Sequence, residues 1–146
     1  MITKTDWDDL FKVKIRNFEE STDKHDIIKL LIMRKLVRKY QNEKKWIRVY
    51  AEHPITINKE TRIADVLFQN IKTKEQYAFE IQRDYKQKWL NSIKEFYKDW
   101  DKCLSNMFFK TSDVITIPLD EILADKKLTF NELVKELNKE LDKYII

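Results

Sequence analysis

The amino-acid sequence predicts an α/β protein with a small central mixed sheet flanked by helices. A helical stretch precedes three stretches with strand character, and a second helical stretch then leads to a fourth strand. Successive strands with short connections pair antiparallel, whereas a crossover through a helix returns the chain to a parallel neighbour. A chain of 146 residues, 42% of them hydrophobic, is long enough for one domain with a core. We therefore expect a single domain over residues 1–146, with a core at about 21–117, an N-terminal arm at 1–20 and a C-terminal helix at 129–144.

The first expected element is a helix that follows the N-cap residue types Ser21, Thr22 and Asp23 and continues to about Tyr40. Its apolar face is so wide that we expect the helix to be largely buried. After a loop at 41–45, residues 46–52 alternate as a strand does. We expect His53-Pro54 to end this strand and to lie in a loop, since proline cannot donate a ladder hydrogen bond.

A hairpin over residues 62–82 is the centre of the prediction. Both of its ends are rich in β-branched and aromatic residues, and the interval 70–75 is polar. With the turn centred between Lys72 and Thr73, Asp65 and Glu80 fall opposite one another. Like charges at directly opposed positions destabilise a sheet, so this pair calls for a compensating group. A divalent cation is the simplest one, because Mg²⁺ is commonly held by one or two carboxylates.

The remaining chain predicts a helix from Tyr85 to about Cys103 with Asp84 as its N-cap, and a strand at 113–117 ended by Pro118. The aromatic and aliphatic residues of that helix have the spacing of a core face. A short helix is expected at 119–124. Thr129 and Glu132 form a capping box that predicts the start of the last helix.

Composition excludes several classes of protein. The chain has no glycine, so the glycine-rich phosphate loops of P-loop and dinucleotide-binding enzymes are excluded. Cys103 is the only cysteine, which excludes an internal disulfide and favours an intracellular location and a structural thiol. No apolar run is long enough to span a membrane. The net charge of +4 permits a polyanionic partner without requiring one.

The element order, together with Asp65 and the sequence Glu80-Ile81-Gln82, resembles the PD-(D/E)xK, or restriction-endonuclease-like, nuclease superfamily. The likeness covers residues 21–117. The local sequence around both acids looks most like that of the competence-protein-like branch and of small nucleases of archaeal viruses and mobile elements. The resemblance implies a metal-dependent DNA nuclease that uses Mg²⁺ or Mn²⁺, in some cases as a homodimer. Asp65 and Glu80 would bind the metal, and Gln82 would help to place the attacking water or the phosphate.

This sequence departs from the superfamily pattern at two positions. Ala64 replaces the proline that precedes the first acid, and Gln82 replaces a lysine. The resemblance suggests that a lysine from the following helix, Lys86 or Lys88, takes over this role. Further candidates for the site are Asp26, Glu20 and Glu52 as a third acid and His25 beside Asp26, while Arg62, Arg83, Lys86 and Lys88 would hold the DNA.

Two other readings remain open at this point. The chain could be a nucleic-acid-binding module on the same fold that has lost catalysis, which the replacement at Gln82 would explain. It could also be an interaction subunit of a viral or mobile-element complex, in which case it would show no salt-sensitive affinity for DNA. For the acid pair, the plain alternative is that one carboxylate faces solvent and pairs with Arg62 or Lys88. Neither the form of the nucleic acid nor the choice between ends and interiors follows from the sequence.

Overall fold

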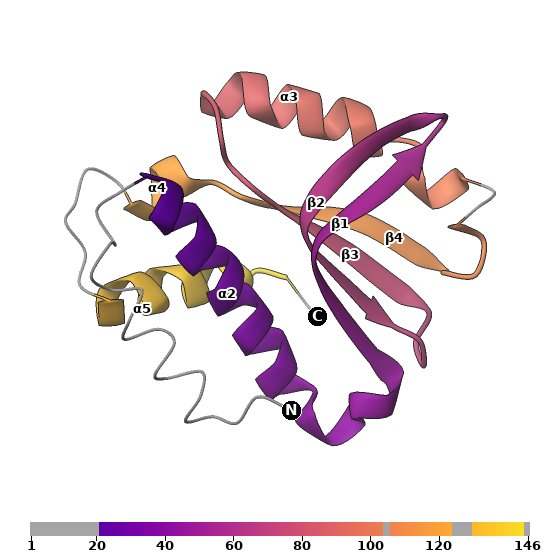
Figure 1. Cartoon of the computed structure of the whole chain (residues 1–146), viewed down its shortest axis with the longest axis horizontal. Coiled ribbons are helices and arrows are strands. Elements are labelled where there is room, and N and C mark those ends of the chain that lie inside the picture. Colours follow the sequence, from indigo (N-terminus) through magenta and orange to yellow (C-terminus); the bar gives the residue numbers. More distant parts are fainter. Residues whose placement is uncertain (1–20, 104–105, 124–129, 145–146) are drawn as a thin grey trace.

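The computed structural model of the chain describes residues 21–103, 106–123 and 130–144. It is a mixed α/β structure in which helices flank a four-stranded sheet (Figure 1), as the sequence predicted. The elements in order are α2 (Ser21–Lys39), the 3₁₀ helix η1 (Gln41–Trp46), β1 (Ile47–Ile57), β2 (Glu60–Asn70), β3 (Glu75–Ile81), α3 (Lys86–Tyr97), the 3₁₀ helix η2 (Trp100–Lys102), β4 (Thr111–Ile117), α4 (Leu119–Leu123) and α5 (Phe130–Leu141).

The strand order in the sheet is β1-β2-β3-β4. The first three strands form an antiparallel meander, and β4 pairs parallel to β3 after the crossover through α3. Val66 pairs with Phe79, and the same register places Asp65 across from Glu80. The hairpin therefore has the register that its sequence predicted, with the turn centred between Lys72 and Thr73.

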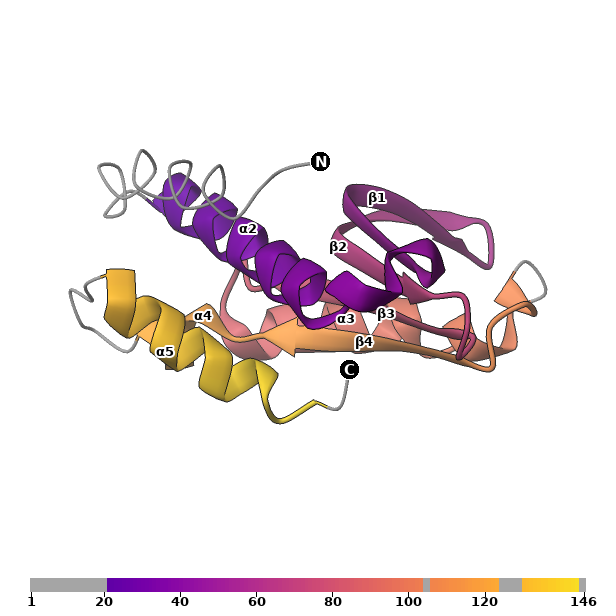
Figure 2. The ribbon, with the colours of Figure 1, turned by 90° about the horizontal axis from the view of Figure 1, so that it is seen from below.

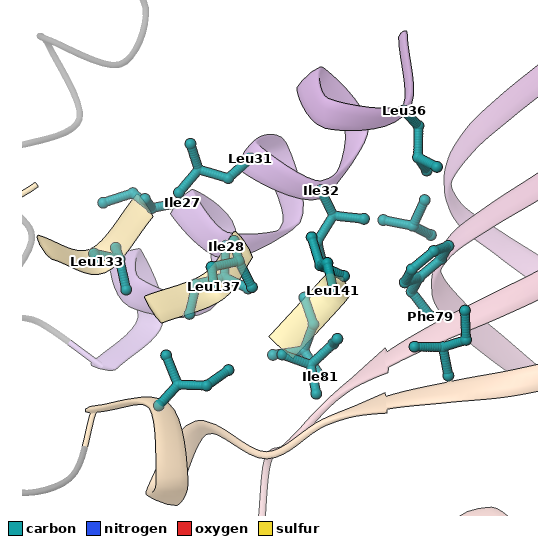
Figure 3. Close-up of a cluster of buried hydrophobic side chains, with 14 of the residues drawn as sticks. Ile27, Ile28, Leu31, Ile32, Leu36, Phe79, Ile81, Leu133, Leu137 and Leu141 are labelled. Atoms are coloured by element: carbon teal, nitrogen blue, oxygen red, sulfur yellow. The ribbon is translucent and has the colours of Figure 1, made fainter. Parts of the chain in front are cut away.

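The two faces of the sheet carry separate cores. On one face, α2 and α5 pack together over the sheet, and Figure 3 shows Leu137 of α5 beside Ile28 of α2 and Leu141 between Ile32 of α2 and Ile81 of β3. On the other face, α3 buries Trp89, Ile93 and Tyr97 together with Trp100 of η2. Figures 1 and 2 show this layered arrangement from two directions, with α3 on the opposite side of the sheet from α2 and α5. The prediction that α2 is largely buried holds for part of its apolar face: Ile27, Ile28 and Ile32 are at most 1% exposed, whereas Val37 near the end of the helix is 39% exposed.

The prediction that His53-Pro54 ends the first strand is wrong. β1 continues through both residues to Ile57, and Pro54 pairs with Ile63. Proline is tolerated there because β1 is an edge strand, where one side of the strand has no ladder to join. Glu52 has a φ of +49° and is skipped in the pairing between β1 and β2.

Some helix boundaries also differ from the expectations. The helix expected at 85–103 is shorter, because α3 ends at Tyr97 and the chain continues as η2. Asp84 is not its N-cap. Tyr85 occupies that position, and the Asp84 carboxylate accepts a hydrogen bond from the Tyr85 N–H at 2.7 Å. The Tyr85 side chain, expected in the core, is 84% exposed.

The chain makes its turns without glycine by placing other residues in the left-handed region. Asn58 and Lys59, with φ of +50° and +71°, form the two-residue connection between β1 and β2, and positive φ at both central residues is the requirement of a type I′ hairpin turn. In the β2–β3 connection, the Asn70 side chain accepts hydrogen bonds from the N–H groups of Lys72 and Thr73, both at 3.1 Å. Lys74 then takes a φ of +59°.

Three expectations concern residues outside the described part of the chain: the arm at 1–20, Glu20 and the capping role of Thr129. The last described helix runs over Phe130–Leu141, so it ends before the expected 144. Within the described residues, no helix has both the length and the apolar character needed to cross a membrane.

Candidate functional site

Two buried carboxylates lie on neighbouring strands where the pairing of β2 with β3 ends. Asp65 is 3% exposed and Glu80 is 2% exposed. Burial of an acid is unfavourable unless it is paired or hydrogen-bonded, so the partners of each carboxylate define what the site is. Both acids have such partners, and the two sets differ.

Asp65 is bound by groups that stabilise its ionised form. Its Oδ2 accepts a hydrogen bond from the Ile81 N–H at 2.7 Å, and its Oδ1 lies 2.8 Å from Nη2 of Arg83. His25 Nε2 is 3.3 Å from the same Oδ1, although the angle between them falls short of a hydrogen bond. Burial by itself would raise the pKa of Asp65, but His25, the Ile81 amide and Arg83 outweigh it and lower the pKa below its usual value.

Glu80 has fewer partners that stabilise its ionised form, and its pKa is shifted upward, in the opposite direction to that of Asp65. Its Oε2 accepts hydrogen bonds from Nε of Arg62 at 3.2 Å and from the Tyr97 hydroxyl at 3.0 Å. Burial raises the pKa of Glu80 to about 7, with a further contribution from the negative charge of Asp65, while Arg62 and Tyr97 oppose the rise. The same contact with Glu80, together with burial, raises the pKa of the Tyr97 hydroxyl.

Paired titratable groups whose environments push their pKa values apart are typical of sites that carry out chemistry. The ionised form is thus favoured at Asp65, whereas burial favours the protonated form at Glu80. A cation that bound between them would relieve the cost of ionising Glu80. The donor set also fits a hard divalent ion, because Mg²⁺ takes one or two carboxylates and completes its shell with water and phosphate oxygens.

Gln82 is oriented by α4 rather than by the acid pair. Its amide Nε2 donates to Asp120 Oδ2 at 2.6 Å and to the Asp84 carbonyl at 2.9 Å, and its Oε1 accepts from the Asp120 N–H at 3.1 Å. The side chain is 5% exposed. Its role in placing a water or a phosphate stays a prediction, and the contacts that hold it link the end of β3 to the start of α4.

The candidates from α2 and β1 divide between two charge clusters. His25 contacts Asp65, as described above. Asp26 and Glu52 share one partner: Lys29 Nζ lies 3.5 Å from Asp26 Oδ1 and 3.0 Å from Glu52 Oε1. Lys29 is one helical turn after His25, so both side chains project from the same side of α2.

Lys29 and Asp120 were not singled out from the sequence. The Lys29 side chain is only 12% exposed, yet it lies in a helix with many other lysines and arginines, and nothing in the residue pattern distinguishes it. Asp120 enters the site through Gln82, a contact between segments 38 residues apart. A lysine four residues after a candidate histidine is the one signal that the sequence offered for Lys29.

The basic candidates around the acids occupy different places. Arg62 and Arg83 each contact one of the acids, and Arg83 is 60% exposed. Lys86 forms an ion pair with Glu121 of α4, and Lys88 lies 3.4 Å from Asp84. The structure thus brings Arg62, Arg83 and His25 to the acid pair, while it pairs Lys86 and Lys88 with other acids.

Within the described residues, no three histidine, cysteine, aspartate or glutamate side chains gather closely enough to form a metal site by themselves. Asp65 and Glu80 remain the pair of neighbouring buried carboxylates on which a metal site could be built. We searched for related proteins, and no protein-family model, no curated protein and no solved structure matches this chain.

Proposed function

We propose that this protein is a divalent-metal-dependent nuclease of the PD-(D/E)xK, restriction-endonuclease-like, type, with Asp65 and Glu80 as its metal-binding residues. The observation that carries the proposal is the acid pair itself. Its two carboxylates are at most 3% exposed and lie on adjacent antiparallel strands, and each contacts an arginine, Asp65 with Arg83 and Glu80 with Arg62. The element order supports the proposal as well, because a helix, three antiparallel strands, a helix and a parallel fourth strand form the core that the superfamily uses.

A divalent cation held by Asp65 and Glu80 would polarise a phosphate and lower the pKa of a bound water. Groups of the chain itself would orient the two acids and bind the phosphate. The Ile81 N–H and His25 orient Asp65, and the Tyr97 hydroxyl orients Glu80. Arg83 is exposed enough to exchange its contact with Asp65 for a phosphate oxygen, and a guanidinium binds phosphate in a fixed geometry.

Lys29 is a further candidate for the phosphate. It lies one turn after His25, it is mostly buried, and its partner Glu52 occupies the position of β1 that the register sets beside Asp65. A cation in this place would stabilise charge at a phosphate bound to the acids. We assign it the role that the resemblance gave to Lys86 or Lys88, because those two lysines pair with Glu121 and Asp84 instead.

One observation favours a second candidate function, a nucleic-acid-binding module without catalysis. The residue that replaces the superfamily lysine, Gln82, is held by Asp84 and Asp120 and has its amide committed on both sides. A module of this kind would bind nucleic acid through the same arginines and would leave phosphodiester bonds intact.

The test is cleavage of linear, circular single-stranded and branched DNA with Mg²⁺ or Mn²⁺, by wild type, Glu80→Gln and Asp113→Asn. Asp113 is an exposed acid of β4 and serves as the matched control. We expect cleavage that needs metal, is lost in Glu80→Gln and is unchanged in Asp113→Asn. DNA binding by pure wild-type protein with no cleavage under any of these conditions would select the binding module and refute the nuclease.

A further inference from the structure

Three segments meet at the end of the sheet where β2 turns into β3. The Ile71 N–H donates to the Trp46 carbonyl at 2.8 Å, which ties the end of η1 to the turn. The Lys110 N–H donates to the Lys74 carbonyl at 2.7 Å, which ties the segment before β4 to the same turn. Figures 1 and 2 both place this region at the right of the view, at the tip of the β2–β3 hairpin and beside the start of β4.

These segments carry two contacts between a lysine and an aromatic ring, both at this end of the sheet. Lys74 Nζ lies 5.6 Å from the centroid of the Phe108 ring, and Lys45 Nζ lies 5.3 Å from that of Trp46. The Phe108 ring is 53% exposed, and it packs edge-on against Phe109 with the centroids 5.1 Å apart. We call the set the turn-end surface and define it by Lys45, Trp46, Lys72, Lys74, Phe108 and Lys110.

The position of Lys74 is fixed by the backbone. Its φ of +59° is unfavourable for a residue with a side chain, and it is maintained by two hydrogen bonds to its carbonyl, from the N–H groups of Lys110 and Thr111 at 2.7 and 3.3 Å. The turn therefore fixes the backbone of Lys74, and from that position its amine reaches the Phe108 ring at 5.6 Å from the centroid. An exposed large apolar ring with a cation held beside it is an arrangement that hydrophobic burial does not explain.

The charge of the turn-end surface is positive. Its four lysines are all exposed. Acids near it have other partners as well: Glu43 lies 3.9 Å from Lys72, Glu75 accepts a hydrogen bond from the Tyr77 hydroxyl at 2.8 Å, and Asp101 accepts one from the Ser112 N–H at 3.0 Å. Glu80 lies five positions after Glu75 in β3, which corresponds to about 17 Å along the strand. The turn-end surface is thus a separate place from the acid pair.

We propose that the turn-end surface binds single-stranded nucleic acid, with bases stacked on Phe108 and Trp46 and the backbone phosphates beside the four lysines. Exposed aromatic rings among cations are how proteins bind single strands without reading their sequence. Paired bases in a duplex hide their faces, so Phe108 would have nothing to stack on there. The inference extends the proposed function by naming the form of the nucleic acid, but it rests on different residues and needs no cleavage.

The experiment measures binding of a fluorescent oligothymidine of about 20 nucleotides, long enough for one such site, by anisotropy in EDTA over a range of salt concentrations. We expect Phe108→Ala to weaken binding about tenfold, since stacking of one base on an aromatic ring contributes about 1–3 kcal/mol and 1.4 kcal/mol corresponds to a factor of about ten. Phe108→Tyr should restore most of it, and Phe108→Leu should not. Lys72→Ala and Lys110→Ala should each reduce the slope of log K against log salt by about 0.7.

Lys139→Ala is the matched control, because it removes an exposed lysine of α5, and it should leave both affinity and slope unchanged. Equal binding by wild type and Phe108→Ala, with equal salt slopes, would overturn the proposal. So would oligothymidine binding too weak to detect combined with self-association that Phe108→Ala abolishes, since the surface would then join two copies of the chain. Because the assay contains no metal, the proposal stands or falls independently of whether Glu80→Gln affects cleavage.

Discussion

Two buried polar clusters lie on the same pair of strands, β2 and β3, and they differ in the charge of their side chains and in the partners that bind them. Near the turn, Gln76 is 2% exposed and is bound by neutral groups. Near the other end, Asp65 and Glu80 are equally buried and are bound by charged groups. Burial of a polar side chain is therefore common to both clusters and does not by itself identify a site.

The cluster around Gln76 is self-sufficient. The Gln76 amide donates to Ser112 Oγ at 3.0 Å and to Asn106, and its oxygen accepts from Gln69 Nε2 at 3.0 Å. Asn106 in turn donates to the Trp100 carbonyl at 3.0 Å. Such a satisfied network fixes β3, β4 and the segment before β4 relative to one another and has no remaining capacity for a ligand.

The acid cluster is unbalanced. The pKa of Asp65 is lowered from its ordinary value and that of Glu80 is raised. Arg83, one of the cations of the cluster, is 60% exposed. The acid cluster thus differs from the Gln76 cluster in carrying buried charge whose compensation is incomplete or exchangeable, which is the property expected of a site that binds a ligand. The following predictions test that distinction.

The largest expected effect is on catalysis. Glu80→Gln or Asp65→Asn should reduce metal-dependent cleavage by about 1,000-fold or more, because each would remove a charge that the proposed mechanism needs to hold the metal. Gln76→Ala, at the other cluster, should leave the cleavage rate per folded molecule within about threefold of wild type, since no reacting group contacts it. Single-turnover cleavage under conditions where each variant is folded measures both. A comparable loss in Gln76→Ala would remove the distinction between the clusters.

The next effect is on the pH dependence of stability in EDTA. The folded-state pKa of Glu80, about 7, lies above its ordinary value of 4.5, so the folded protein holds this proton more tightly than the unfolded chain. The resulting stability is fully present below pH 4.5 and is lost as the pH rises through 7, a change on the order of 3 kcal/mol. Asp65, whose pKa is lowered, acts in the opposite direction, but only at pH values around and below 3.8.

Urea unfolding at several pH values between 5 and 8 measures this change. Wild type should lose stability across the interval, and Glu80→Gln, which cannot ionise, should lose much less. A wild-type free energy of unfolding that stays level from pH 5 to pH 8 would show that burial does not raise the pKa of Glu80.

A smaller effect is expected at the neutral cluster. Gln76→Ala should lower the free energy of unfolding by about 2 kcal/mol, because it removes the partner of the buried Asn106 side-chain oxygen and of the half-buried Gln69 amide, and one of the two partners of Ser112 Oγ. This loss should be the same at pH 5 and pH 8, unlike that of the acid cluster. Chemical denaturation at the two pH values checks it, and a loss that varied with pH would mean that the two clusters are coupled.

The smallest effect is expected at Gln82. Gln82→Ala removes the link to Asp120 and Asp84 and should cost about 1 kcal/mol of stability. Cleavage should fall by less than tenfold, since the amide is held by α4 and not by the acid pair. A loss of cleavage as large as that of Glu80→Gln would instead give Gln82 the water- or phosphate-placing role predicted from the sequence.

The sequence was sufficient for the features that follow from local pattern. The position of the turn between Lys72 and Thr73 determined the hairpin register, and the register placed Asp65 opposite Glu80. The sequence was insufficient where tertiary context decides. Pro54 continues a strand only because that strand is at the sheet edge, and Tyr85 is exposed because the helix begins one residue later than expected.

The composition of the site was predictable only in part, for the same reason. The acids, Arg62, Arg83 and His25 were named from strand positions and from the resemblance, and the structure brings them together. Lys29 and Asp120 depend on how α2 and α4 pack at the ends of the strands, which no short-range pattern encodes. The pKa of Glu80 depends on burial and on its neighbours in space and could not have been derived before those were known.

The central claim is that Asp65 and Glu80 together bind a divalent cation. Its most direct test is a calorimetric titration of metal-free protein with Mn²⁺ at pH 8, a pH above the pKa values of both acids. We predict one binding event per chain in wild type and in Asp113→Asn, with binding at least about tenfold weaker in Glu80→Gln. Unchanged Mn²⁺ binding in Glu80→Gln, or wild-type protein that binds no Mn²⁺ when titrated alone or with uncleavable DNA present, would contradict the assignment of the acid pair as a metal site.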